Sequence, residues 1–224
     1  MEEFHGCLFS TEDLYFVEEM LWLRPVGGRS LRIGVLPVTQ ALWGKISSMN
    51  AKQPRSEIAE GRAICYVEAR RFVGNIKAPF DLVIDRLNSV VLEKPWVIQT
   101  GHGESSWLCE VTALKEDYMS RLRSWDEARP EVLRIINERG VVCFSEPPDY
   151  VYAAVGIDCS QLLMVLSDRL EGMADGSVIH VVADYNEGAE KDLEKWSQIT
   201  GNEVLEFRVE KRLAHALIRK KASV

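Results

Sequence analysis

Residues 63–87 read AICYVEARRFVGNIKAPFDLVIDRL, and this stretch decides the fold of the first half of the chain. It is rich in isoleucine, valine, phenylalanine and tyrosine, which favour strands. Gly74-Asn75 and Pro79 interrupt it with residues typical of tight turns. The stretch therefore predicts strands joined by tight turns.

The sequence on either side continues the β pattern. Upstream, residues 31–35 alternate as in a half-buried strand, and Pro37 stops the pattern before a brief helix at 39–43. Downstream, residues 96–98 and 107–111 are again apolar and aromatic, on either side of Gly101-His102-Gly103, which is typical of a turn. The first half is predicted to be all-β or nearly so.

The composition changes to charged residues over 115–139, where apolar side chains recur at helical intervals. Pro130 predicts a break between two helices, and Gly140 is placed to cap the second one. The proline-rich loop at 145–149 marks the expected domain boundary.

The last third predicts the order strand, helix, strand, helix, strand, strand. The expected elements are strands at 150–155, 177–184, 203–209 and 213–219, with helices from Cys159 and over 187–200. Gly201 is expected to end the second helix. Such an arrangement forms a two-layer α/β sandwich, with both helices on one face of the sheet.

Charge and composition limit the function classes. The 224 residues include 27 Lys and Arg against 34 Asp and Glu, a net charge of −7, with 46% apolar residues. That balance lacks the electrostatic footprint of a protein that binds nucleic acid or an anionic membrane. The start of the chain lacks the pattern of a signal peptide, and no apolar stretch approaches the ~20 residues that span a bilayer. We expect a cytoplasmic protein without nucleic-acid or membrane partners.

The five cysteines are odd in number and widely separated, with no C-x-x-C pair and no histidine at metal-ligand spacing. They are Cys7, Cys65, Cys109, Cys143 and Cys159. The pattern predicts neither a disulfide framework nor a metal site, and most of these residues are expected to be buried. Only Cys159 has a local reason to be reactive.

Ordered blocks in the first half resemble the H protein of the glycine cleavage system, a small barrel-sandwich carrier of lipoic acid. The blocks are EMLWL at 19–23, LRIG at 31–34, QALWGKI at 40–46, EG at 60–61, YVEA at 66–69, APF at 78–80, Asn88, Gly103-Glu104 and Trp107-Leu108. The resemblance covers about residues 18–114. It implies a lipoyl-type barrel-sandwich hybrid whose partners are lipoate-handling or glycine cleavage-type enzymes.

The acceptor position departs from that family. The resemblance places the lipoylated lysine at the tip of a β-turn, two residues after Ala69 and eight before Pro79, and both counts give Arg71. A guanidinium stays protonated and cannot be acylated, so no lipoate cofactor is expected. Lys77 is the nearest lysine, but it lies in the strand that leaves the turn, where a ligase that reads turn geometry should miss it. Arg70-Arg71 is either a solvated remnant of the turn or a cationic tip that docks on an acidic partner or an anion.

The last third resembles the TusA/SirA-like sulfur carriers, which hold a persulfide on a cysteine at a helix start. The matching blocks are GIDC at 156–159, VVAD at 181–184 and LIRK at 217–220, within a resemblance over 150–220. Ser160 and Leu162 replace the two prolines of the family motif, and Ala153 replaces a common aspartate. The resemblance implies that Cys159 carries sulfane sulfur.

The chemistry of Cys159 can also be argued from its position. A thiol in the first turn of a helix lies near unpaired N–H groups and the positive end of the helix dipole, which favour the thiolate. Asp158 opposes this effect, and no Lys or Arg lies within several residues. Two interpretations stay open, a reactive carrier cysteine and a buried cysteine at the helix cap, where Asp158 and Ser160 are both good N-caps.

The remaining candidates indicate structure rather than chemistry. The four histidines are scattered and define no catalytic triad, and His180, inside an apolar strand, is expected in the core or in a cross-strand contact. Gly101-His102-Gly103 lacks the spacing of a phosphate-binding loop. The acidic residues between 187 and 194 are most simply the solvated face of one helix.

The sequence thus predicts an α+β protein of two domains. A barrel-sandwich domain covers 1–115, a helical linker covers 116–147, and the βαβαββ sandwich covers 148–224. The expected function is a carrier or adaptor in sulfur or lipoate-linked metabolism, whose partners donate or accept sulfur, handle lipoate or cleave glycine. The alternatives are a scaffold in which both carrier sites are degenerate and a glycine cleavage H protein. A non-enzymatic carrier is expected; an enzymatic activity would be of the sulfurtransferase type.

Overall fold

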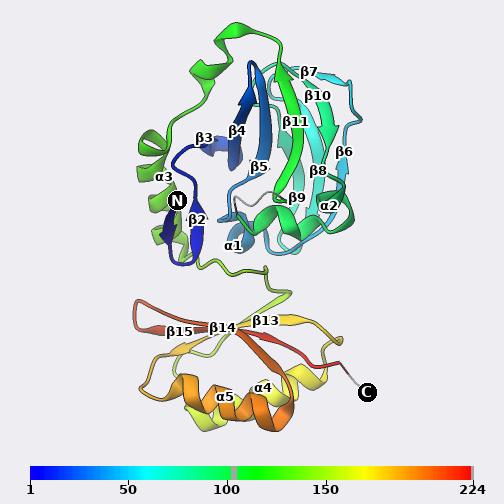
Figure 1. Ribbon diagram of the computed structural model, residues 1–224. Helices are drawn as coiled ribbons and strands as arrows, with labels where there is room; N and C mark the ends of the chain where they lie inside the picture. Colours follow the sequence, from blue (N-terminus) through cyan, green and yellow to red (C-terminus); the bar gives the residue numbers. More distant parts are fainter. Residues whose placement is uncertain (102–104, 223–224) are drawn as a thin grey trace. The chain divides into compact units, whose positions relative to one another are not determined.

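The computed structural model describes residues 1–101 and 105–222 (Figure 1). The chain divides into two units, Met1–Pro147 and Pro148–Val224, and each is described by itself. Within the described residues, no helix is long and apolar enough to cross a membrane.

Two antiparallel sheets form the body of the first unit (Figure 1). Their strands are β3 (Leu14–Phe16), β4 (Leu21–Gly27), β5 (Ser30–Val35), β6 (Ile46–Ala51), β7 (Glu57–Ile58), β8 (Ala63–Ala69), β9 (Phe72–Lys77), β10 (Leu82–Leu87) and β11 (Trp107–Ala113). The larger sheet has the order β3-β4-β5-β11-β10-β7, and the smaller one has the order β6-β8-β9. Alternate residues of both sheets, such as Leu31 and Ile33 of β5 and Ile64 of β8, meet in one buried cluster. The result is a β-sandwich.

The strands expected within residues 63–87 are present, and so is the β-turn that the resemblance placed at Arg71, but the turn expected at Gly74-Asn75 is wrong. β9 runs through Gly74 and Asn75, and Arg70 and Arg71 make the connection from β8 to β9. A Cβ at Gly74 would lie 2.6 Å from the ring of Phe72, on the same face of the strand. Gly74 therefore makes room for an aromatic ring and does not form a turn.

Four short helical segments lie between the strands, and the first is a 3₁₀-helix, η1 (Val17–Glu19), between β3 and β4. Helix α1 (Thr39–Trp43) follows β5 as predicted. The strand expected at 96–98 is wrong, because this segment belongs to a 3₁₀-helix, η2 (Pro95–Gln99), that follows α2 (Ser89–Glu93). Asn88 caps the start of α2, and a proline at the first position of η2 fixes a helical φ there.

Helix α3 (Trp125–Arg139) belongs to the first unit and is preceded by a 3₁₀-helix, η3 (Glu116–Arg121). Pro130 lies inside α3, so the break predicted at this proline is wrong. Trp125 begins the helix and stacks on Phe9, with ring centroids 4.9 Å apart. Gly140 ends the helix in the left-handed conformation, as predicted. The segment expected to link two domains thus packs its apolar face on the first unit.

A disulfide joins Cys7 to Cys143, contrary to the expectation from the cysteine spacing. Cys7 begins β2 (Cys7–Phe9), which forms a hairpin with β1 (Glu2–Phe4), and Cys143 lies just beyond α3. The backbone N–H of Cys143 also donates to the carbonyl of His5 at 2.9 Å. A sequence separation of 136 residues left no spacing signal from which to predict this bond.

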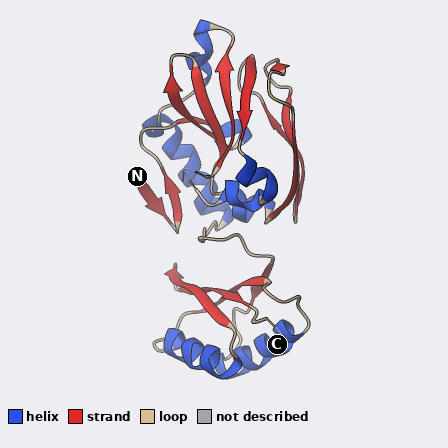
Figure 2. Ribbon diagram, turned by 45° about the vertical axis from the view of Figure 1, so that its right-hand side comes forward, coloured by secondary structure: helices blue, strands red, loops and turns tan. Residues whose placement is uncertain are grey.

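The second unit has the predicted βαβαββ order. Its elements are β12 (Tyr150–Ala153), α4 (Cys159–Glu171), β13 (Val178–Asp184), α5 (Ala189–Thr200), β14 (Glu203–Glu210) and β15 (Leu213–Arg219). The sheet order is β12-β13-β15-β14, in which β12 and β13 are parallel. Both helices cover the same face of the sheet (Figure 2). Leucines of the helices and apolar residues of β13 and β15 form the core between the two layers.

Candidate functional site

The turn that carries Arg70 and Arg71 is fastened to α1. The backbone N–H of Arg71 donates to the carbonyl of Trp43 at 2.8 Å, and that of Arg70 donates to the carbonyl of Lys45 at 3.2 Å. The guanidinium of Arg71 donates to the carbonyl of Ala41. The exposed side chain of Arg71 therefore folds back onto α1.

Aromatic stacking and a glycine complete this contact. Trp43, at the end of α1, stacks on Phe72, the first residue of β9, with ring centroids 4.5 Å apart. Gly44 follows with φ of +72°, and a Cβ there would lie 2.9 Å from the Cβ of Arg70. Any side chain at Gly44 would push the turn away from α1.

Two buried side-chain amides, those of Gln40 and Gln99, connect α1 to neighbouring segments of the chain. The side-chain amide of Gln40 donates to the carbonyls of Gln99 and Phe144 at 2.8 and 2.9 Å and accepts from the N–H of Phe144 at 3.1 Å. Gln99 donates to the carbonyl of Gly44 and accepts from the N–H of Ile46, at 2.9 and 3.0 Å. Such satisfied buried networks fix one arrangement of the backbone. The helix that contacts the turn is thus held in one position. The sequence did not predict this network.

Lys77 lies at the far end of the same hairpin, as expected. Its register partner on β8 is Ala63, at the opposite end of that strand from the turn. Its ammonium forms an ion pair with Glu19, with Nζ and Oε1 2.9 Å apart. Lys77 lies six residues after Arg71 along the strand, roughly 20 Å at the usual rise of a strand.

Cys159 is the first residue of α4 and is half-buried. Asp158 caps the helix by accepting the N–H of Ser160 at 3.0 Å. Burial raises the pKa of the Cys159 thiol, and the carboxylates of Asp192 and Asp158 add to this, against a hydrogen bond from Asn186 that lowers it. Burial and the two carboxylates thus oppose the effect of the helix start, and both interpretations of Cys159 stay predictions.

Two histidines of the second unit contact each other. They are His180 on β13 and His215 on β15, with Nε2 and Nδ1 3.0 Å apart, so the cross-strand contact predicted for His180 is confirmed. His102 lies outside the described residues, as do Gly103 and Glu104. Within residues 1–101 and 105–222, no cluster of three or more His, Cys, Asp or Glu side chains could hold a metal ion.

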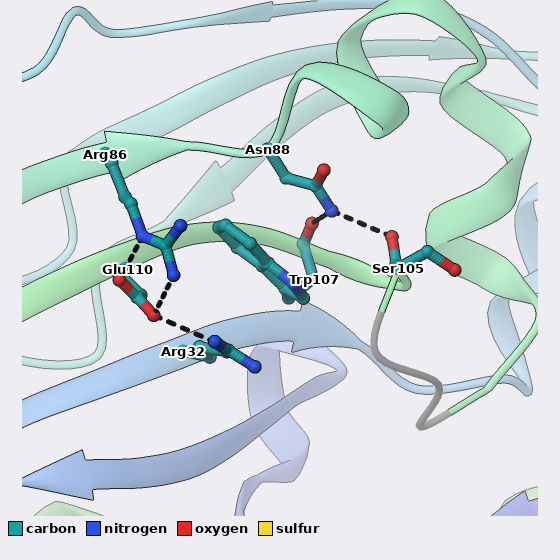
Figure 3. Close-up of polar contacts among 6 residues, drawn as sticks. All are labelled: Arg32, Arg86, Asn88, Ser105, Trp107 and Glu110. Atoms are coloured by element: carbon teal, nitrogen blue, oxygen red, sulfur yellow. Dashed lines mark hydrogen bonds and ion pairs between the residues drawn. The ribbon is translucent and has the colours of Figure 1, made fainter.

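Sequence reasoning missed a charged cluster on the larger sheet, which Figure 3 shows. Glu110 on β11 lies opposite Arg86 on β10 and Arg32 on β5, and both guanidinium groups bond to its carboxylate. They hold the pKa of Glu110 at about 2. Both also lie over the ring of Trp107, Arg86 at 5.0 Å and Arg32 at 5.1 Å from its centroid. These residues meet only through strand pairing, so no sequence spacing reveals them.

Asn88 links the end of β10 to this cluster (Figure 3). Its side-chain amide donates to the carbonyls of Ser105 and Trp107, both at 2.8 Å, and its oxygen accepts from the N–H of Val90 at the start of α2. Asn88 and Trp107 were part of the resemblance to the H protein. Their structural link shows that these two matching blocks support one local arrangement.

Known proteins that are similar to this chain match its first unit. The sequence model described as "Glycine cleavage H-protein" matches residues 14–133. Glycine cleavage system H protein 3 of Aquifex aeolicus is 23% identical over 145 residues, which are 63% of this chain and 90% of that protein. Glycine cleavage system H protein 5 of the same organism is 24% identical over 148 residues, 64% of this chain and 99% of that protein.

The H protein of Nocardia farcinica is 27% identical over 102 residues, 46% of this chain and 77% of that protein. The crystal structure of the H protein from Mycobacterium marinum aligns with a TM-score of 0.47 and 19% identity, over 55% of this chain and 98% of that one. The matched family region ends before the second unit, whose resemblance to sulfur carriers stays a prediction. Because the family model matches more than half of the residues, the chain belongs to the glycine cleavage H-protein family.

Proposed function

We propose that this chain is an adaptor in lipoate-linked metabolism, a member of the H-protein family that carries no lipoyl group itself. The observation that carries the proposal is Arg71, which lies in the β8–β9 turn where the family resemblance places the lipoyl lysine. Its guanidinium cannot be acylated and is bonded to the carbonyl of Ala41.

The contacts around the turn favour one of the two interpretations of Arg70-Arg71. They support an ordered surface that binds a partner rather than a turn whose charges are merely solvated. A swinging carrier arm needs a mobile side chain, whereas Arg71 is anchored to α1, and α1 rests on the Gln40–Gln99 network. An ordered guanidinium loses less conformational entropy when it pairs with a carboxylate. The proposed partners are lipoate-handling or glycine cleavage-type enzymes that present an acidic surface to this turn.

Lipoylation tests the acceptor argument directly. Full-length wild type, Arg71→Lys and Arg70→Lys are incubated with a lipoate ligase, lipoate and ATP, and the intact mass is measured. We expect one lipoyl group on Arg71→Lys and none on wild type or on Arg70→Lys, which moves the amine by one position. A lipoyl group on Lys77 of the wild type would contradict the proposal and favour a working glycine cleavage H protein.

Binding tests the adaptor argument. The glycine cleavage enzymes and lipoate ligase of the same host are titrated with wild type, Arg71→Glu and Arg62→Glu, a matched reversal at another exposed arginine. We expect Arg71→Glu to lose affinity and Arg62→Glu to keep it. Failure of every enzyme to bind, or equal binding by Arg71→Glu, would refute the adaptor role.

A persulfide on Cys159 is a second candidate function. The half-buried position of Cys159 at the start of α4 supports it, whereas the raised pKa of its thiol weighs against spontaneous sulfur uptake. Intact mass and peptide mapping before and after thiol reduction decide it. A reducible sulfur adduct that Cys159→Ser abolishes supports the carrier role, and an unmodified Cys159 removes it.

A further inference from the structure

The second unit encloses a cavity of about 220 Å³ between its two layers. Its walls are apolar and come from both helices and the sheet: Leu162 and Leu166 of α4, Leu193 of α5, and Val181, Ala183 and Ala216 of the strands. All six side chains are buried. The cavity is thus part of the core rather than a shallow surface depression.

The mouth of the cavity lies where parallel strands end and helices begin. Cys159 starts α4, Asp184 ends β13, and Asn186 precedes α5, and all three line the cavity together with Asp158. Ligands of open α/β sheets bind at the carboxyl ends of parallel strands. A ligand in the cavity would therefore lie beside the thiol of Cys159 and change its reactivity.

Two carboxylates make the mouth of the cavity negatively charged. Asp158 accepts a hydrogen bond from the N–H of Ser160, and Asp184 accepts one from the N–H of Gly156 at 2.6 Å. These two N–H groups are therefore already bonded and do not bind an anionic ligand. The described residues that line the cavity include no Lys, Arg or His. A ligand with a carboxylate head would face two negative charges without a compensating cation.

The volume limits the size of the ligand. A cavity of about 150 Å³ lined by apolar side chains accommodates benzene, with its six carbons. A volume of about 220 Å³ therefore has room for an apolar group of roughly eight or nine carbons at the same packing. An aliphatic chain suits this space because most of the side chains that line it are aliphatic.

We propose that this cavity binds an uncharged aliphatic chain of about eight carbons, such as a medium-length acyl amide, with its polar end beside Cys159. The binding site is separate from the Arg71 turn, so its failure would leave the adaptor proposal intact. Occupancy covers the Cys159 thiol, and the ligand makes no covalent bond.

Alkylation of Cys159 in the full chain tests the proposal, with octanamide as the probe. Cys7 and Cys143 form the disulfide and Cys65 and Cys109 are buried, so the mass of the alkylated chain reports on Cys159. At about ten times its dissociation constant, octanamide should slow the alkylation about tenfold. Butyramide should protect less because it fills less of the cavity, and octanoate should protect less because of its charge.

Two cavity variants and one control variant distinguish binding in the cavity from a general effect of substitution on the sheet. Ala216→Leu fills the cavity and should abolish protection while Cys159 still reacts, and Ala183→Leu repeats the test from β13. Ala153→Leu makes the same change on β12 at an exposed position that does not line the cavity, and it should keep protection. No protection by octanamide up to its solubility limit, equal protection by octanoate, or full protection in both cavity variants would overturn the proposal.

Discussion

Loss of the Cys7–Cys143 disulfide should strongly destabilise the first unit. The bond joins residues 136 apart in sequence, so almost the whole β-sandwich lies within the closed loop. The chain-entropy relation for a loop of this length gives about 5 kcal/mol of stabilisation at 25 °C. Native disulfides give 2–5 kcal/mol in practice, so we expect reduction to lower the free energy of unfolding by about 3 kcal/mol or more.

Tryptophan fluorescence in guanidinium chloride measures this loss. Trp22 and Trp125 lie in the same buried cluster as both cysteines, so their emission reports the unfolding of this region. Oxidised protein, protein in reductant, and Cys7→Ala/Cys143→Ala are compared. Cys159→Ser is the control, because its thiol is outside the disulfide.

Thiol counting in denaturant checks that the bond is present. Three free thiols are expected, those of Cys65, Cys109 and Cys159. Five free thiols under non-reducing conditions, or a difference of less than about 1 kcal/mol between oxidised and reduced protein, would refute the reasoning.

Three further predictions concern the larger sheet. Gly34→Ala places a Cβ 2.3 Å from the buried Trp22 ring and should cost about 1–3 kcal/mol, seen as a lower thermal midpoint; an unchanged midpoint would contradict this packing. The folded-state pKa of Glu110 is about 2 against 4.5 ordinarily, so its contribution is present above pH 4.5 and is lost as the pH falls toward 2. Glu110→Gln should remove about 1–2 kcal/mol of this pH dependence, after allowance for the exposure of Arg86, and an unaltered acid-unfolding curve would argue against the ion pairs. Asn88→Ala removes a helix cap and two bonds to carbonyls and should cost about 2–3 kcal/mol in a urea titration, and Asn88→Asp, which keeps the cap acceptor but turns a carboxylate oxygen toward the two carbonyls, should lose at least as much; wild-type stability of either variant would contradict these bonds.

Elements with a strong local pattern could be predicted from the sequence. The βαβαββ order of the second unit and the cap at Gly140 match the structure because hydrophobic periodicity and glycine at a helix end are local signals. The prediction of a turn at Gly74 was wrong because glycine has two structural uses. Glycine is required both where φ is positive and where another group comes close, and only the ring of Phe72 shows which reason applies.

Contacts between distant residues could not be predicted. The position of Arg71 was available from spacing within one hairpin, but its bond to Ala41 requires α1 to fold beneath the turn. The Gln40–Gln99 network and the Glu110 cluster likewise join segments whose pairing no local pattern encodes. Residues that a resemblance singles out, such as Asn88, were found without any indication of what they bind.

Cys159 shows how a correctly predicted local element can leave the electrostatics of its site open. The helix starts where predicted, but Asp158 uses the N–H of Ser160, and folding brings Asp192 of α5 close to the thiol. Burial and these carboxylates favour the neutral thiol over the thiolate that attacks sulfur. A cation or a base beside the mouth of the cavity would lower the pKa of this thiol and so favour sulfur transfer through Cys159. The adaptor role proposed for Arg71 likewise depends on a partner protein, because a guanidinium cannot carry a lipoyl group itself.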